Sequence, residues 1–208
     1  MRNLILSATL MAASLFGATA HAEFEAGKQY VELNNPVQIA KPGKIEVVEL
    51  FWYGCGHCYQ FESTLNPWVE QLPDDVNFVR IPALFGGMWN VHGQLFITLE
   101  AMKAEPKVHA AVFDGIHKQG KKLATPEEMA DFLASEGIDK EAFLKTYNSF
   151  GVKSQLEKAK KLAMAYQISG VPVMVVNGKY RFDIGSAGGP QKVLQVADHL
   201  IGKERATQ

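Results

Sequence analysis

The chain has 208 residues, of which 47% are apolar, and its 21 basic and 22 acidic residues leave a formal net charge of −1. This balance excludes a disordered chain and a dedicated binder of polyanions such as nucleic acid. The length fits one domain, or one domain with an insertion. The sequence therefore predicts an ordinary globular protein.

Residues 1–22 predict a secretory signal peptide. Arg2 precedes an apolar run from Leu4 to Ala18, and the small residues Ala20 and Ala22 mark a cleavage point. A transmembrane anchor is the alternative, but the run is shorter than the roughly 20 apolar residues that cross a bilayer. We expect an exported, soluble protein that is cut near Ala22.

The two cysteines of the chain lie where a predicted strand is followed by a predicted helix. The run from Ile45 to Tyr53 is apolar on both faces, as central parallel strands are. The next segment predicts an amphipathic helix that begins at or just after the cysteines and is kinked at Pro67. Its apolar stripe comprises Phe61, Leu65, Trp68 and Leu72.

The middle of the chain changes character after a second predicted strand, Val76 to Ile81. Gly86 and Gly87 follow it, and residues 90–166 carry helical periodicity. Thr125 and Asp139 fit helix N-caps within this region. We expect a helical insertion subdomain over residues 86–166.

Strand character returns near the C-terminus, at Val173 to Val176. Asn177 and Gly178 then predict a tight hairpin into Tyr180–Phe182. A last helix is expected after Pro190. The predicted order is strand, helix, strand, helical block, hairpin and helix, which indicates an α/β fold.

Cys55 and Cys58 are the two cysteines, and two residues separate them. Exported proteins normally use cysteines as cross-links, but a loop this short removes little chain entropy from the unfolded state. Thiol–disulfide exchange needs an exposed thiolate and a second thiol close enough to resolve a mixed disulfide, and this spacing supplies both. The pair therefore predicts a redox centre.

The two sulfurs are expected to differ. The partial positive charge of the helix N-terminus stabilises a Cys55 thiolate, and His57 adds a donor beside it. Cys58, one turn further along, is expected to be the buried resolving partner. Because a stabilised thiolate favours the reduced state, the disulfide form becomes a better oxidant.

Three other interpretations of the pair are weaker. A c-type haem requires His directly after the second cysteine, where Tyr59 stands, and an inert disulfide this local would be strained. A zinc site requires two more ligands. The available histidines are scattered over predicted helices, at His92, His109, His117 and His199.

Two segments carry a family resemblance. Residues Phe51 to Glu62 read Phe-Trp-Tyr-Gly-Cys-Gly-His-Cys-Tyr-Gln-Phe-Glu, and Gly170 to Val173 read Gly-Val-Pro-Val. They resemble the DsbA family of bacterial periplasmic oxidoreductases, and the lead-in to the cysteines is similar to pseudomonad-type members. The resemblance implies a thioredoxin fold with an inserted all-helical subdomain, the thioredoxin-like domain being residues 23–85 and 167–208.

The resemblance also assigns roles to individual residues. It implies that Cys55 is the nucleophile, Cys58 the buried partner, and His57 the residue that stabilises the thiolate. Pro172 matches the cis-proline that faces the disulfide, and Val171 before it presents backbone groups to an extended substrate peptide.

Gly56, which we group with the substrate-binding residues, departs from the pattern. Many DsbA proteins have proline here, whereas Gly-His is the pair of protein disulfide isomerases. The potentials of these two classes differ by about 60 mV, or about 2.8 kcal/mol, and both are oxidants. The departure bears on the redox potential and leaves the reaction class unchanged.

Glu49 shares a strand face with Val47 and Phe51, where an isolated carboxylate is costly to bury. By resemblance it matches a buried acid that helps to move the proton of the second cysteine, and an acid of raised pKa near a thiol fits such a role. The alternative is an edge position with the acid in solvent. Arg80 is the expected partner.

The resemblance implies reduced, unfolded exported proteins as substrates and a DsbB-like, quinone-linked membrane protein as the oxidase that restores the disulfide. It further implies a periplasmic monomer that needs no metal and no dissociable cofactor besides the Cys55–Cys58 disulfide. A disulfide isomerase or reductase is the alternative within this class, although periplasmic ones usually carry an added dimerisation domain. A non-catalytic chaperone is the alternative outside it.

Overall fold

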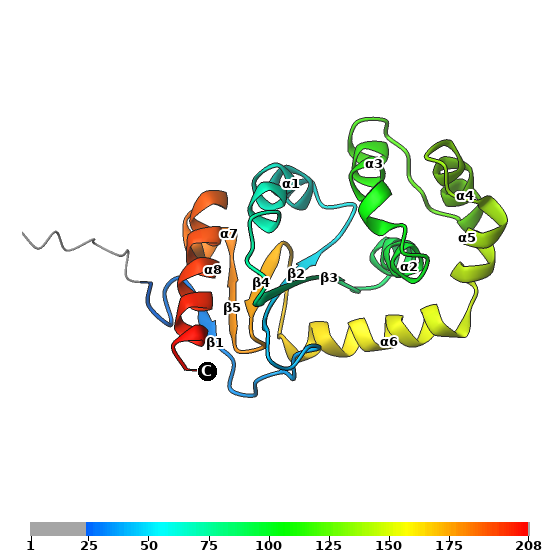
Figure 1. Cartoon of the computed structure of the whole chain (residues 1–208). Helices are drawn as coiled ribbons and strands as arrows, with labels where there is room; N and C mark the ends of the chain where they lie inside the picture. Colours follow the sequence, from blue (N-terminus) through cyan, green and yellow to red (C-terminus); the bar gives the residue numbers. More distant parts are fainter. Residues whose placement is uncertain (1–23, 208) are drawn as a thin grey trace, which may run out of the picture.

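A mixed β-sheet organises the part of the chain that this computed structural model describes, residues 24–207. Its five strands are β1 (Val31–Glu32), β2 (Ile45–Phe51), β3 (Val76–Pro82), β4 (Val173–Val176) and β5 (Tyr180–Asp183). They lie in the order β1-β5-β4-β2-β3 (Figure 1). β2 is parallel to β3 and antiparallel to β4, and β5 pairs antiparallel with β4 and β1. The predicted signal peptide lies outside the described residues.

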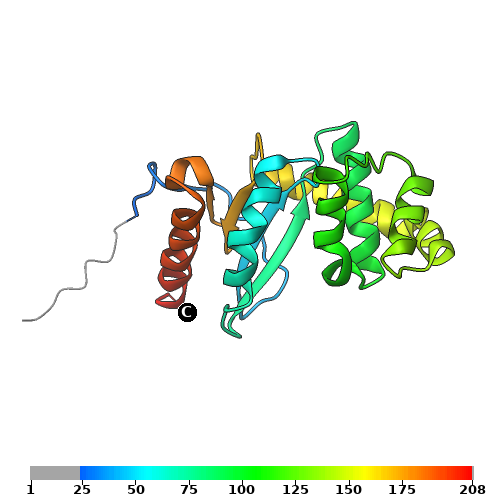
Figure 2. The same ribbon diagram turned by 90° about the horizontal axis from the view of Figure 1, so that it is seen from above.

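Eight helices accompany the sheet within residues 24–207. They are α1 (Gly56–Val69), α2 (Met88–Ala101), α3 (Glu105–His117), α4 (Pro126–Ser135), α5 (Lys140–Tyr147), α6 (Phe150–Ala165), α7 (Ile184–Ala187) and α8 (Pro190–Arg205). The block α2–α6 lies beyond β3 at the opposite end of the molecule from α8, and α6 returns the chain to the sheet (Figure 1 and Figure 2). None of the helices in this part of the chain is long and apolar enough to cross a membrane.

β2 is buried along its whole length because both faces of the sheet are covered. Val47 joins an apolar cluster that includes residues of α1 and α8. Val48 and Leu50 join a second cluster, on the side of the helical block. The predicted central strand is therefore confirmed, although it ends at Phe51 and not at Tyr53.

The short-range signals of the sequence are also confirmed. Thr125 Oγ1 accepts the N–H of Glu128 at 3.2 Å at the start of α4, and Asp139 caps α5. Asn177 and Gly178 both have positive φ, 51° and 65°, as the predicted hairpin requires. The two-residue β1 and the four-residue α7 were not predicted, because they are too short to show a periodic pattern.

Five consecutive helices, α2 to α6, occupy the chain between β3 and β4. This arrangement agrees with the helical periodicity of residues 90–166. The division into a discontinuous domain of residues 23–85 and 167–208 and an insertion of residues 86–166 stays a prediction.

Candidate active site

Cys55 lies at the turn where β2 gives way to α1. Its backbone is extended, with φ −86° and ψ 115°, and its N–H donates to the Trp52 carbonyl over 2.9 Å. Gly54 permits this turn, because a β-carbon there would lie 2.3 Å from the Trp52 ring. Cys55 is the N-cap of α1, so its sulfur faces the free N–H groups of the first helical turn, as the sequence predicted.

The Cys55 sulfur is half-buried and sits among hydrogen-bond donors. It accepts the backbone N–H of Cys58 at 3.3 Å, and its thiol lies 3.7 Å from the carbonyl oxygen of Val171. The hydrogen bond from the Cys58 side chain, aided by the backbone N–H groups of Cys58 and His57, outweighs burial and lowers the pKa of Cys55 to about 6. The positive charge of the exposed His57 is a smaller contribution in the same direction.

Cys58 has the opposite character. Its side chain is fully buried, and burial raises the pKa of its thiol far above the usual range. The hydrogen bond with Cys55 and the negative charge of Glu49 raise this pKa further. Both cysteines are free thiols in this structure, which is therefore the dithiol form.

The peptide bond between Val171 and Pro172 is cis, as the resemblance implied, and the substrate-binding role of Pro172 stays a prediction. This loop and the first turn of α1 border a cavity of about 630 Å³ beside the cysteines. Gly56 is exposed at the start of α1, and a β-carbon on it would meet nothing within 4 Å. The cavity is lined by His57, Gln60, Phe61, Ser169, Gly170, Val171, Pro172, Val173, Asp183, Ile184, Gly185 and Pro190.

Glu49 is fully buried in the central strand, so the alternative of an edge position in solvent is wrong. Its Oε2 accepts a hydrogen bond from Nε of Arg80 at 3.0 Å, as the sequence predicted. Its Oε1 has no partner among the described residues. Burial outweighs the Arg80 charge and raises the pKa of Glu49 to about 7.

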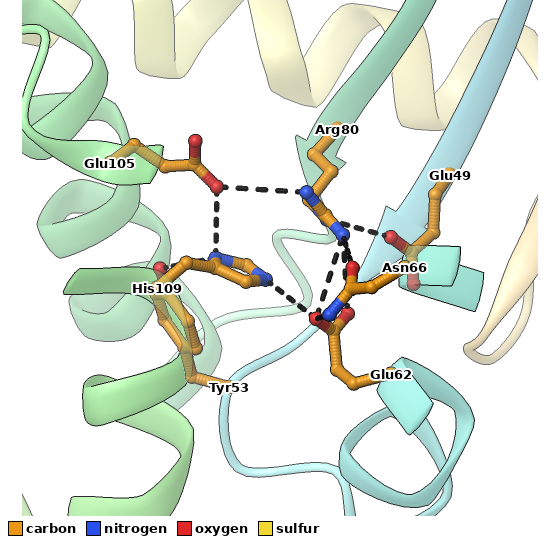
Figure 3. Close-up of polar contacts among 7 residues, drawn as sticks. All are labelled: Glu49, Tyr53, Glu62, Asn66, Arg80, Glu105 and His109. Atoms are coloured by element: carbon orange, nitrogen blue, oxygen red, sulfur yellow. Dashed lines mark hydrogen bonds and ion pairs between the residues drawn. The ribbon is translucent and has the colours of Figure 1, made fainter. Parts of the chain in front are cut away.

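Sequence analysis missed the network beyond Arg80, which Figure 3 shows. Arg80 donates to Asn66 Oδ1 at 2.7 Å and lies 3.5 Å from Glu62 and 3.8 Å from Glu105. Two i,i+4 pairs on the helices were the available signal: Glu62 with Asn66 on α1, and Glu105 with His109 on α3. Neither pair alone reveals that both meet Arg80.

No group of three or more metal-binding side chains occurs among residues 24–207, so nothing here favours the zinc interpretation over the redox one. A strand–turn–helix unit that holds one acidic thiol above one buried thiol, beside a cis-proline loop, has the chemistry of thiol–disulfide exchange. The fold and the site thus define a thiol:disulfide oxidoreductase.

Comparison with known proteins identifies the family. A family model described as a DSBA-like thioredoxin domain matches residues 89–200. The thiol:disulfide interchange protein DsbA of Pseudomonas aeruginosa is 71% identical over 207 residues, covering 99% of this chain and 98% of that protein. The protein of the same name from Azotobacter vinelandii is 69% identical over the full length of both chains. The chain belongs to the DsbA family, and to its pseudomonad type.

Solved structures agree with this assignment. The crystal structure of Pseudomonas aeruginosa DsbA matches with a TM-score of 0.86 at 72% identity, covering 88% of this chain and 96% of that chain. The oxidoreductase DsbA of Xylella fastidiosa matches with a TM-score of 0.83 at 33% identity, covering 88% and 98%. The predicted α/β class, a thioredoxin fold with helices inserted, is confirmed, and the chain is a protein thiol:disulfide oxidoreductase.

Proposed function

We propose that the chain donates its Cys55–Cys58 disulfide to reduced, unfolded proteins exported to the periplasm. The observation that carries this direction is the place of the Cys55 sulfur at the N-terminus of α1, where it accepts the N–H of Cys58 at 3.3 Å and where the pKa of its thiol is lowered to about 6. A stabilised thiolate lowers the free energy of the reduced enzyme, so the disulfide form gives up its oxidising equivalents readily.

The exchange proceeds in two displacements. A substrate thiolate attacks the Cys55 sulfur, the Cys55–Cys58 bond breaks, and its electron pair leaves with the Cys58 sulfur, which takes up a proton. A second substrate thiolate then attacks the substrate sulfur of the mixed disulfide and expels Cys55 as a thiolate. The substrate dithiol is oxidised to a disulfide, and the enzyme disulfide is reduced to the dithiol.

Glu49 handles the proton of Cys58 in this proposal. A carboxyl group with a pKa of about 7 exists in both protonation states near neutral pH, so it can give a proton and take one back. The negative charge of Glu49 raises the pKa of the Cys58 thiol, so the two groups interact electrostatically. In the oxidising direction Glu49 protonates the departing Cys58 sulfur, and in reoxidation it accepts that proton.

Substrate is held beside Cys55 by the loop that faces it. The Val171 carbonyl lies 3.7 Å from the Cys55 sulfur, so an extended peptide attached to that sulfur passes along the backbone of Val171 and Pro172. Gly56 leaves open space at the start of α1, and His57 lines the same cavity as Val171 and Pro172. The adjoining cavity accommodates apolar side chains of the unfolded chain.

Export and reoxidation complete the proposal. The segment 1–22 directs the chain to the periplasm and is removed near Ala22. The monomer acts without a metal or a dissociable cofactor, and a DsbB-like, quinone-linked membrane oxidase regenerates the Cys55–Cys58 disulfide.

The redox equilibrium with glutathione tests the direction of transfer. The purified protein, without residues 1–22, is equilibrated in mixtures of reduced and oxidised glutathione, and Trp52 fluorescence reports its state. A potential well above the value of about −270 mV typical of thioredoxin is expected. A potential at or below that value would contradict the donor role and favour a reductase.

A further inference from the structure

His109 of α3 lies buried at the centre of the network in Figure 3, although the proposed exchange assigns it no role. Its Nδ1 is 3.0 Å from Oε1 of Glu105 and 2.9 Å from the Tyr53 hydroxyl. Its Nε2 is 3.5 Å from Oε2 of Glu62. Both ring nitrogens therefore lie within ion-pair distance of a carboxylate, and only the cationic ring presents an N–H to both carboxylates.

The charges that face His109 come from every element around it. Glu62 lies on α1, Glu105 on α3 and Arg80 on β3, and the neutral Tyr53 hydroxyl follows β2. Arg80 in turn contacts Glu49 on β2. The buried cluster thus contains three carboxyl groups and, when His109 is protonated, two cations, so it is electrically balanced only while Glu49 carries its proton.

The surroundings of His109 favour its cationic form. Burial by itself lowers the pKa of His109, but the close contacts with the carboxylates of Glu105 and Glu62 outweigh burial and raise it. The effect is mutual, because the same bond to His109 helps to hold the pKa of Glu62 below its usual value despite burial. Two carboxylates at these distances therefore favour the positive charge on His109.

We propose that His109 is a positioning residue for disulfide exchange, which acts through Glu62 and Arg80 to keep the buried Glu49 able to accept the proton of Cys58 at neutral pH. This inference rests on the proton-transfer role proposed for Glu49. His109 would thus link the helical block to the cysteines. It lies on α3, whereas the other residues of the proposed path lie on the sheet or on α1.

The sign of the effect follows from the charges around Glu49. Burial raises the pKa of Glu49, Arg80 and His109 lower it, and Glu62 raises it. Removing the His109 cation should raise the pKa of Glu49 further. Fewer molecules then carry the Glu49 carboxylate at a given pH, and the deprotonation of Cys58 becomes slower at neutral pH.

The test isolates the step in which Cys58 loses its proton. Reduced protein is mixed with saturating oxidised glutathione, so that Cys55 forms a mixed disulfide and Cys58 then attacks the Cys55 sulfur and expels the glutathione thiolate. Acid quench and mass spectrometry follow this step between about pH 5 and about pH 9. In the unmodified protein the rate should rise with a midpoint near the Glu49 pKa of about 7.

His109→Gln should move this midpoint upward by about one pH unit, the order expected for one unit charge in a medium of effective dielectric constant about 20. Glu62→Gln combined with His109→Gln removes one charge of each sign and should bring the midpoint back. His92→Gln is the matched control, because His92 is equally buried in the helical block but bonds the Lys122 carbonyl and no carboxylate.

A role confined to packing would change the rate by the same factor at every pH. An unmoved midpoint in His109→Gln, or a double variant that stays shifted, would overturn the inference. Glu49→Gln separates this failure from that of the proposed function. If Glu49→Gln abolishes the midpoint while His109→Gln leaves it in place, only the role of His109 is wrong. If Glu49→Gln keeps the midpoint, the proton-transfer role of Glu49 and the inference both fall.

Discussion

The two cysteines are three residues apart and yet occupy opposite electrostatic environments. Cys55 takes its character from hydrogen-bond donors within one helical turn, which lower its pKa to about 6. Cys58 takes its character from burial, from its hydrogen bond with Cys55 and from the charge of Glu49, which belongs to a network drawn from β2, β3, α1 and α3. The Cys55 sulfur is therefore stabilised as a thiolate, and the Cys58 sulfur is stabilised as a thiol.

This difference shows how one short motif supplies two functions. Thiolate stabilisation needs only the end of a helix, because unpaired N–H groups are present at every helix N-terminus. Proton transfer to and from a buried sulfur needs ionisable groups that are buried as well. Such groups are costly to bury unless each has a partner of opposite charge or a hydrogen bond. The first is a local property of the chain, and the second depends on the complete fold.

The largest expected effect comes from removing either sulfur. Cys55→Ser should reduce disulfide transfer to a dithiol peptide by a factor on the order of 10³ or more, because the variant cannot form the disulfide that the substrate thiolate attacks. Cys58→Ser, mixed with oxidised glutathione, should instead accumulate a stable mixed disulfide between Cys55 and glutathione, visible by mass spectrometry, because no second thiol can expel the glutathione. Equal trapping at both positions would remove the distinction between the two sulfurs.

Glu49→Gln tests the buried environment of Cys58 through the pH dependence of protein stability. The pKa of Glu49 is raised from 4.5 to about 7, so its contribution to stability is fully present below pH 4.5 and is lost as the pH rises through 7. Glutamine does not ionise, so the variant does not lose stability in this way as the pH rises. The free energy of unfolding of the variant, relative to the unmodified protein, should therefore increase by up to about 3 kcal/mol between about pH 4 and about pH 8. A difference that does not change with pH in urea denaturation would contradict the raised pKa.

Gly54→Ala tests the packing that shapes the turn before Cys55. The added β-carbon would lie 2.3 Å from the Trp52 ring, which itself stacks on Trp89 at 4.1 Å. Displacing this stack should cost about 1–3 kcal/mol of unfolding free energy, measured in urea. Gly56→Ala, where the β-carbon meets open space, is the matched control and should cost nothing measurable.

Gly56→Pro gives the smallest expected effect and tests the helix end that carries Cys55. Proline suits the first position of a helix, and Cys55 before it already has the extended backbone that a following proline requires. The substitution should stabilise the protein by about 0.5–1 kcal/mol, because it restricts the unfolded chain. Destabilisation would show that the Gly56 N–H is needed at the helix end.

Sequence reasoning succeeded where the determining interactions are short in range. The β2–α1 turn, the caps at Thr125 and Asp139, and the hairpin at Asn177 each depend on residues within a few positions of one another. The pairing of Glu49 with Arg80 was also predicted, and the parallel register of β2 and β3 places the two residues opposite each other. The cis form of Pro172 came from family resemblance, because the residues around it also fit an ordinary trans proline.

The rest of the network depends on contacts that no periodic pattern encodes. His109 was set aside as one scattered histidine, because its helix is brought against α1 only by the packing of the whole helical block. Glu62 stood inside the family motif without a stated role. Its carboxylate lies 3.5 Å from both Arg80 and His109, two residues that are distant from it in the sequence.

The most direct test of the contrast between the sulfurs is a titration of the reduced protein, followed by the ultraviolet absorbance of the thiolate. The account predicts one transition near pH 6, assigned to Cys55 by its loss in Cys55→Ser, and a Cys58 thiol that stays protonated far above neutral pH. A single transition near the ordinary thiol value of 9.0, or simultaneous ionisation of both sulfurs, would contradict it.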